Sequence, residues 1–67
     1  MATNTTIGEN IQKRRIKLGL SQEDFAQKSG VKYTTLTKIE SGVIKKPSVL
    51  IMAKIAKALG VSIEDLL

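Results

Sequence analysis

Apolar residues recur every three or four positions along most of the chain, and no stretch shows the strict alternation of a half-buried strand. A spacing of three and four places side chains on one face of an α-helix. Each apolar run is bounded by residues that start or stop helices. The pattern therefore predicts an all-α fold of five short helices, over residues 7–18, 22–29, 33–40, 49–59 and 63–67.

The helix boundaries are marked by small polar residues and by glycines. Thr6 and Glu9 have the spacing of a capping box, and Ser21 with Asp24 forms a similar pair. A glycine after the last turn closes a helix in the left-handed conformation, and a proline keeps the residues before it out of a helix. The further start and stop signals are Gly19, Gly30, Pro47, Ser48, Gly60 and Ser62.

Each helix has one apolar face, and together these faces predict a single small core. In the first helix Ile7, Ile11 and Leu18 align, whereas Ile16 points to the opposite side and has no explanation in the pattern. The other expected core residues are Phe25, Ala26, Val31, Leu36, Ile39, Val49, Met52, Ala53, Ile55, Ala56 and Leu59. A chain of 67 residues makes one domain. We expect a flexible N-terminus over residues 1–5 and the domain over residues 6–67.

Composition excludes several classes of function. The chain has no cysteine and no histidine, so it lacks disulfides, the usual zinc ligands and the usual general base. No nucleophile has a base beside it in sequence, so we expect no enzymatic activity. We also expect no metal, because the usual ligands are missing, and no cofactor. No small-molecule ligand is indicated. The sequence shows no signal peptide and no apolar run of about 20 residues, which favours the cytoplasm and no membrane partner.

The net charge of +5 is concentrated in the middle of the chain. Between Phe25 and Ile63 the only acid is Glu40, and the basic residues there are Lys28, Lys32, Lys38, Lys45, Lys46, Lys54 and Lys57. A basic surface favours a polyanion, most commonly nucleic acid. The alternative is a solvated, lysine-rich surface without a partner. The scarcity of aromatic residues argues against recognition of single strands by base stacking.

An ion pair is expected between the first and third helices. Arg14 falls inside the apolar stripe of the first helix and Arg15 falls at its edge, where an unpaired charge is costly. Glu40 is the only acid between Asp24 and Glu64. We therefore predict a structural pair between Arg15 and Glu40. The alternative is two exposed charges that contribute little to stability.

Residues 21–39 predict two helices joined by a tight turn. Gly30 can take the left-handed conformation there, and Val31 fills the corner. On the second helix Leu36 and Ile39 face inward. The helical wheel places four polar residues on the opposite side: Tyr33, Thr34, Thr37 and Lys38. A polar, cationic helix held by its neighbour has a shape that the major groove of DNA admits.

Four stretches resemble the lambda/434 phage repressor type of helix-turn-helix, the Cro/C1 or xenobiotic-response-element family: IQKRRIKLGLSQEDFAQKSGV, TKIESG, KKP and AKALGVSIEDLL. They cover nearly the whole chain, and their combination is specific although each stretch alone is weak. One position departs from the pattern. Ser29 stands where the family usually has an apolar residue, and we expect it to loosen the turn. The resemblance implies the compact five-helix lambda-repressor-like fold and dimers on near-palindromic operators.

The resemblance also implies roles for individual residues. Gln22 matches a glutamine that bonds a phosphate and braces the recognition helix, whereas Lys45 and Lys46 match a basic loop that holds phosphate. Arg15 and Glu40 match an internal ion pair. The positions that face bases are matched by Lys32, Tyr33, Thr34, Thr37 and Lys38, of which Lys32 matches a base- or backbone-contacting site. For Tyr33 the alternative is simple packing against the preceding helix.

A small apolar patch for pairing two copies is expected at Ile44, Leu50, Val61 and Ile63, and the alternative is scattered surface apolar residues, which are normal. Such a patch supports only a weak homodimer without DNA. We therefore predict sequence-specific binding of double-stranded DNA by a small transcriptional regulator of the repressor type, with residues 33–40 in the major groove. The alternatives are the DNA-binding headpiece of a longer regulator and a protein-interaction module or antitoxin-type subunit.

Overall fold

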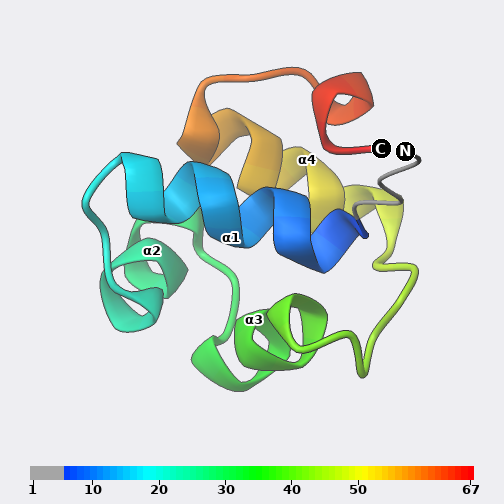
Figure 1. The fold of residues 1–67 in the computed structure, drawn as a ribbon, viewed down its shortest axis with the longest axis horizontal. Helices are drawn as coiled ribbons and strands as arrows, with labels where there is room; N and C mark the ends of the chain where they lie inside the picture. The colour runs from blue at the N-terminus through cyan, green and yellow to red at the C-terminus, as the bar shows by residue number, and fades with distance from the viewer. Residues whose placement is uncertain (1–5) are drawn as a thin grey trace, which may run out of the picture.

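The computed structural model describes residues 6–67, and the flexible N-terminus expected over residues 1–5 lies outside them. The described residues contain no strand, which confirms the all-α prediction. Their elements are α1 (Ile7–Lys17), α2 (Gln22–Ser29), α3 (Tyr33–Glu40), α4 (Val49–Leu59) and the 3₁₀ helix η1 (Ile63–Leu66), shown in Figure 1. The short helix expected over residues 63–67 forms as a single 3₁₀ turn, so residues 6–67 contain four α-helices and not five. A segment of four residues accommodates the tighter i→i+3 bonds of a 3₁₀ turn.

Two reciprocal capping boxes begin α1 and η1. The Thr6 hydroxyl accepts the Glu9 N–H at 3.1 Å, and the Glu9 carboxylate accepts the Thr6 N–H at 3.1 Å. The bond from the Thr6 backbone favours the charged carboxylate and lowers the pKa of Glu9. Ser62 and Asp65 form the same arrangement, which lowers the pKa of Asp65 for the same reason. The sequence predicted both helix starts, the first from Thr6 with Glu9 and the second from Ser62.

The other helix starts differ from one another. The Ser21 hydroxyl accepts the Asp24 N–H at 3.0 Å, and the Ser48 hydroxyl accepts the Ile51 N–H at 3.3 Å. Within residues 6–67 the Ser21 N–H donates no hydrogen bond to the Asp24 carboxylate, so the predicted pair forms only half of a capping box. Lys32 precedes α3 and provides no side-chain cap. The first N–H groups of α3 therefore have no side-chain partner from this position.

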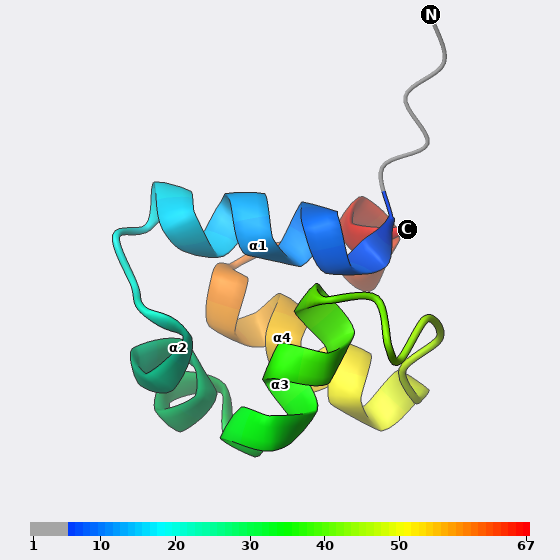
Figure 2. The ribbon, with the colours of Figure 1, turned by 60° about the horizontal axis from the view of Figure 1, so that its bottom comes forward.

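α1 packs across α3 and α4, and α2 packs against the same two helices (Figure 2). Gly8 lies where the first turn of α1 meets the last turn of α3, and an added Cβ would collide with the Ile39 carbonyl oxygen. The absence of a side chain therefore permits this close approach. η1 lies beside the start of α1, where the Asn10 amide and the Arg14 guanidinium donate to the Asp65 carbonyl at 3.0 and 3.4 Å.

One hydrophobic core lies between the helices, and its fully buried side chains are Ile11, Phe25, Leu36, Ile39, Ile55 and Leu66. Three residues predicted for the core are exposed: Leu18, Val49 and Ala53. Leu18 lies after the last turn of α1, as its C-cap. α4 is turned so that Ile51 and Ala58 border its buried stripe in place of Val49 and Ala53. No helix within residues 6–67 combines the length and apolar character that a membrane crossing requires.

Candidate nucleic-acid interface

The turn between α2 and α3 is closed by local hydrogen bonds. Gly30 has φ = 77°, the predicted left-handed conformation, and its N–H donates to the Ala26 carbonyl at 2.9 Å. Val31 is buried at the corner, as predicted. The Ser29 hydroxyl donates to the Ala26 carbonyl and accepts the Val31 N–H, both at 3.3 Å. Ser29 therefore supports the turn through two bonds, contrary to the loosening predicted from the sequence.

The outward side of α3 presents the residues that the sequence predicted for it. Thr34 and Lys38 are exposed, as is Lys32 just before the helix. Tyr33 is 48% exposed, so packing against the protein covers only about half of its surface. Thr37 is half-buried, and its hydroxyl donates to the Thr34 carbonyl at 2.8 Å. With its proton directed at the backbone, Thr37 offers a partner an acceptor oxygen and a methyl group.

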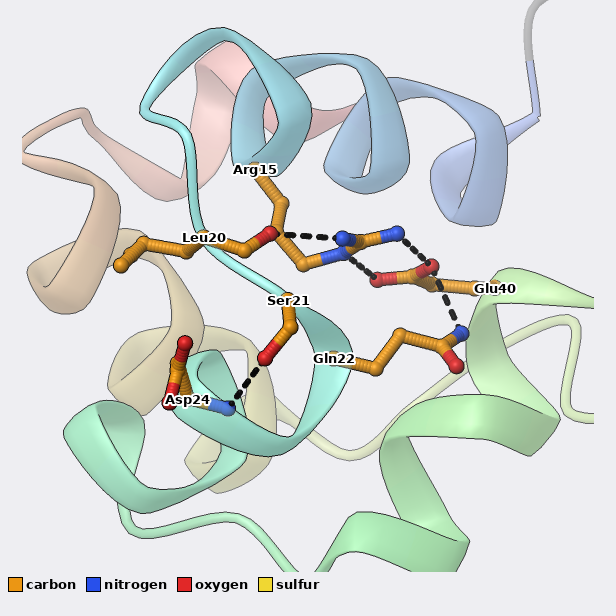
Figure 3. A network of polar contacts seen from close by, with 6 residues as sticks. All are labelled: Arg15, Leu20, Ser21, Gln22, Asp24 and Glu40. Atoms are coloured by element: carbon orange, nitrogen blue, oxygen red, sulfur yellow. Dashed lines mark hydrogen bonds and ion pairs between the residues drawn. The ribbon is translucent and has the colours of Figure 1, made fainter.

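Arg15 and Glu40 form the ion pair expected between α1 and α3, as Figure 3 shows. Arg15 Nε and Nη2 donate to the two carboxylate oxygens at 2.8 and 3.0 Å, and each residue is only 8% exposed. Arg15 Nη1 donates to the Leu20 carbonyl at 2.8 Å. Within residues 6–67 no buried side-chain nitrogen or oxygen lacks a partner. Because every hydrogen-bonding group of the buried pair has a partner, these bonds offset the cost of removing both charges from water.

Gln22 joins the same network from the start of α2. Its Nε2 donates to Glu40 Oε1 at 3.0 Å, so one carboxylate accepts bonds from α1 and α2 while it belongs to α3. This bond is the bracing contact that the family resemblance implied for Gln22. Because an amide nitrogen carries two N–H groups, the half-buried side chain keeps donor capacity for an external acceptor.

The predicted phosphate-binding lysines lie on residues 41–48, the loop between α3 and α4. The Ile44 N–H donates to the Lys38 carbonyl at 3.0 Å, which ties the loop to the last turn of α3. Lys45 and Lys46 follow directly and are both exposed. The backbone therefore holds two cations close to the carboxyl end of the predicted recognition helix.

The predicted pairing patch is only partly at the surface. Ile44, Val61 and Ile63 are half-buried and pack against the core, whereas Leu50 is 68% exposed. The apolar residues near Leu50 in sequence with more exposed surface are Val43, at 72%, and Val49, at 77%. The sequence analysis placed Val49 in the core and assigned no role to Val43. The most exposed apolar residues here therefore lie in the first half of the loop, at Val43, and at the start of α4, at Val49 and Leu50.

The arrangement offers donors and positive charge around α3. Within residues 6–67 the only salt bridge is the one between Arg15 and Glu40, so the exposed lysines have no carboxylate partner there. No group of three potential metal-ligating side chains occurs among the same residues. Cations and hydroxyl groups on a convex helix are suited to hydrogen bonding with an anionic, grooved partner.

Comparison with known sequences identifies relatives over most of the chain. The profile of a family described as Helix-turn-helix matches residues 11–66. The HTH-type transcriptional regulator SinR of Bacillus subtilis is 34% identical over 61 residues, which cover 91% of this chain and 55% of SinR. An uncharacterized HTH-type transcriptional regulator of Methanocaldococcus jannaschii, MJ0272, is 49% identical over 47 residues and 70% of each chain. The chain spans about half the length of the SinR proteins that it matches.

Solved structures share the same arrangement of helices. SinR, crystallised in complex with DNA, aligns with a TM-score of 0.88 and 33% identity over 91% of this chain and 97% of that one. The restriction-modification controller protein C.AhdI of Aeromonas hydrophila aligns with a TM-score of 0.85 and 28% identity over 94% of each chain. The named relatives are a transcriptional regulator and a restriction-modification controller protein, the class of protein that the sequence led us to expect.

Proposed function

Because the chain belongs to the helix-turn-helix family of Cro/C1-type DNA-binding domains, we propose that it binds double-stranded DNA sequence-specifically as a transcriptional regulator of the repressor type. The observation that carries this proposal is the outward side of α3, which is polar and exposed while its inner side is held by Glu40. A helix fixed in this way enters the major groove without losing further conformational freedom. The SinR structure with DNA supports the same partner.

The proposed base-reading residues lie on and just before α3. Lys38 is a donor suited to guanine O6 and N7, and the threonine methyl groups are suited to the thymine methyl. Each good base contact discriminates by about 1–3 kcal/mol. Tyr33 contributes a ring and one hydroxyl, so the preferred sequence cannot be transferred from a relative that has a different side chain at this position. The full proposed set is Lys32, Tyr33, Thr34, Thr37 and Lys38.

The proposed phosphate contacts lie on either side of this reading helix. Gln22 stands at the amino end of α2, and Lys45 and Lys46 stand in the loop after α3. Cations and amide donors at these positions fix the register of the protein on the duplex without reading bases. Loss of one such contact weakens binding equally on every sequence.

We further propose that two copies bind a near-palindromic operator as a weak homodimer, with half-sites about 34 Å apart. Three exposed apolar residues in the loop and at the start of α4 support pairing, and we refer to Val43, Val49 and Leu50 as the exposed apolar group. Lys45 and Lys46 are exposed and lie between Val43 and Val49 in sequence, so pairing through this group would bring like charges of the two copies toward each other. DNA phosphates neutralise these charges, so pairing is expected on the operator rather than in free solution.

Selection from a randomised duplex pool, followed by a salt titration on the selected duplex, tests the proposal. We expect two enriched half-sites about one helical turn apart and an affinity that falls steeply as salt rises. A single enriched half-site would contradict dimeric binding and leave sequence-specific reading intact. Equal weak binding to every duplex, without enrichment, would overturn the proposed function and favour a protein-interaction module.

A further inference from the structure

A groove of about 380 Å³ borders the start of α3 on its α4 side. It is lined by Gly30, Val31, Lys32, Thr35, Ile51 and Lys54. Val31 is buried and Ile51 is half-buried, so the floor is apolar. Lys32 and Lys54 are exposed cations and Thr35 is a half-buried hydroxyl. The groove therefore combines an apolar floor with a polar and positively charged rim.

The groove adjoins the side of α3 proposed to read bases. Thr35 follows Thr34 by one residue, which places it about 100° around the helix, beyond the sector that holds Thr34 and Lys38. Thr35 thus connects the outward side of α3 with the flank that faces α4. The sequence analysis assigned Thr35 to neither side of α3, and it did not connect Lys54 with α3 because the two are distant along the chain.

The positive charge of the groove is not compensated within the protein. Neither Lys32 nor Lys54 forms a salt bridge with any of residues 6–67. Two cations on the rim of one groove repel each other, and an anion between them relieves that repulsion. The phosphate contacts proposed above lie at the start of α2 and in residues 41–48. On the side of α3 that faces α4, Lys32 is therefore the only basic residue so far proposed to contact DNA near the amino end of the helix.

We propose that Lys54 is a further phosphate contact, and that this groove seats the sugar–phosphate backbone beside the amino end of α3. The inference rests on the proposed function, because it assumes that α3 lies in the major groove. The Lys54 ammonium pairs with a backbone phosphate, and the apolar floor faces the deoxyribose. Lys54 positions the protein on DNA and reads no base, since contacts to phosphate carry no sequence information.

The test compares Lys54→Ala with Lys57→Ala by salt titration on the selected duplex. Both lysines are exposed on α4 and both changes remove one positive charge, but only Lys54 lines the groove. A lost phosphate contact lowers the slope of log affinity against log salt by about 0.9. We expect this decrease for Lys54→Ala, an unchanged slope for Lys57→Ala, and recovery of the wild-type slope in Lys54→Arg.

Circular dichroism verifies that each variant keeps its helical content, as expected for exposed positions where alanine favours helix. Equal slopes for Lys54→Ala and Lys57→Ala, with the wild type binding normally, would overturn the inference and leave the proposed function standing. Relaxed preference at one base pair in Lys54→Ala would also overturn it, because a phosphate contact weakens all sequences alike. A wild type without salt-dependent duplex binding would overturn the proposed function itself.

Discussion

The inner and outer sides of α3 use similar polar chemistry with opposite results. Glu40 is buried and accepts bonds from Arg15 and Gln22, whereas Lys38, two residues earlier, is exposed and has no carboxylate partner within residues 6–67. On the inner side, the hydrogen bonds of Glu40 fix α3 to α1 and α2. The outer side keeps its donors for a partner. One side of this short helix therefore holds it in place and the other side is free to contact a partner. Substitutions can change the stability of the fold and the binding of a partner independently.

Glu40→Ala should have the largest effect, because it leaves the Arg15 guanidinium buried without its carboxylate. We expect a loss of about 3–5 kcal/mol in the free energy of unfolding, a large part of the stability of a small domain. Urea denaturation followed by circular dichroism measures it. The control Glu23→Ala removes an exposed acid and should cost at most about 1 kcal/mol.

If Glu40→Ala fails to fold, Glu40→Gln preserves the side-chain shape while it weakens the pair, and its smaller loss is measured in the same way. Unfolding free energies for both Glu40 variants that match the Glu23→Ala control would show that the buried pair does not hold α1 to α3.

Lys38→Ala tests the outer side. We expect a loss of about 1–3 kcal/mol in discrimination at one operator position, since one base contact disappears. The unfolding free energy should stay unchanged because the side chain is exposed. Competition binding with operators varied at each position measures the effect. Lys46→Ala is the matched control, since it should weaken all operators equally; the same uniform loss in Lys38→Ala would assign Lys38 to phosphate.

The smallest effect is expected from the capping boxes of α1 and η1, which lie outside α3 and are tested by lowering the pH. The capping bonds lower the pKa values of Glu9 and Asp65 in the folded protein. Their contribution is therefore complete above the ordinary carboxyl range near about 4 and is lost as the pH falls through the lowered values. The stability advantage of the wild type over Glu9→Ala should shrink there in pH-dependent urea titrations. An advantage that grows on acidification would contradict this.

Local signals in the sequence predicted helix starts and turns well. The capping box of Thr6 with Glu9, the helix start at Ser62 and the turn at Gly30 depend on residues at most a few positions apart, so their geometry follows from the chain itself. The pair between Arg15 and Glu40 was predictable because only one acid was available in the middle of the chain. The roles proposed for Lys32, Lys38 and the other surface residues stay predictions.

The predicted core was wrong where packing against neighbouring helices sets the rotation of a helix about its axis. Val49 and Ala53 fall on an apolar face of α4, but packing turns Ile51 and Ala58 toward the core instead. The wheel gives the angles between side chains and leaves the rotation of the whole helix open. The role of Ser29 was also missed, because its two bonds require the actual turn geometry.

The sequence by itself determined the all-α class, the limits of the four α-helices to within a residue, and the polar character of the outward side of α3. These features depend on hydrogen bonds and periodicities confined to one or two turns. Only the tertiary structure decided which apolar residues remain exposed, how Gln22 meets Glu40, and that Lys54 shares a groove with Lys32. Such features depend on how separate helices pack, and packing is settled by the shape of the whole core.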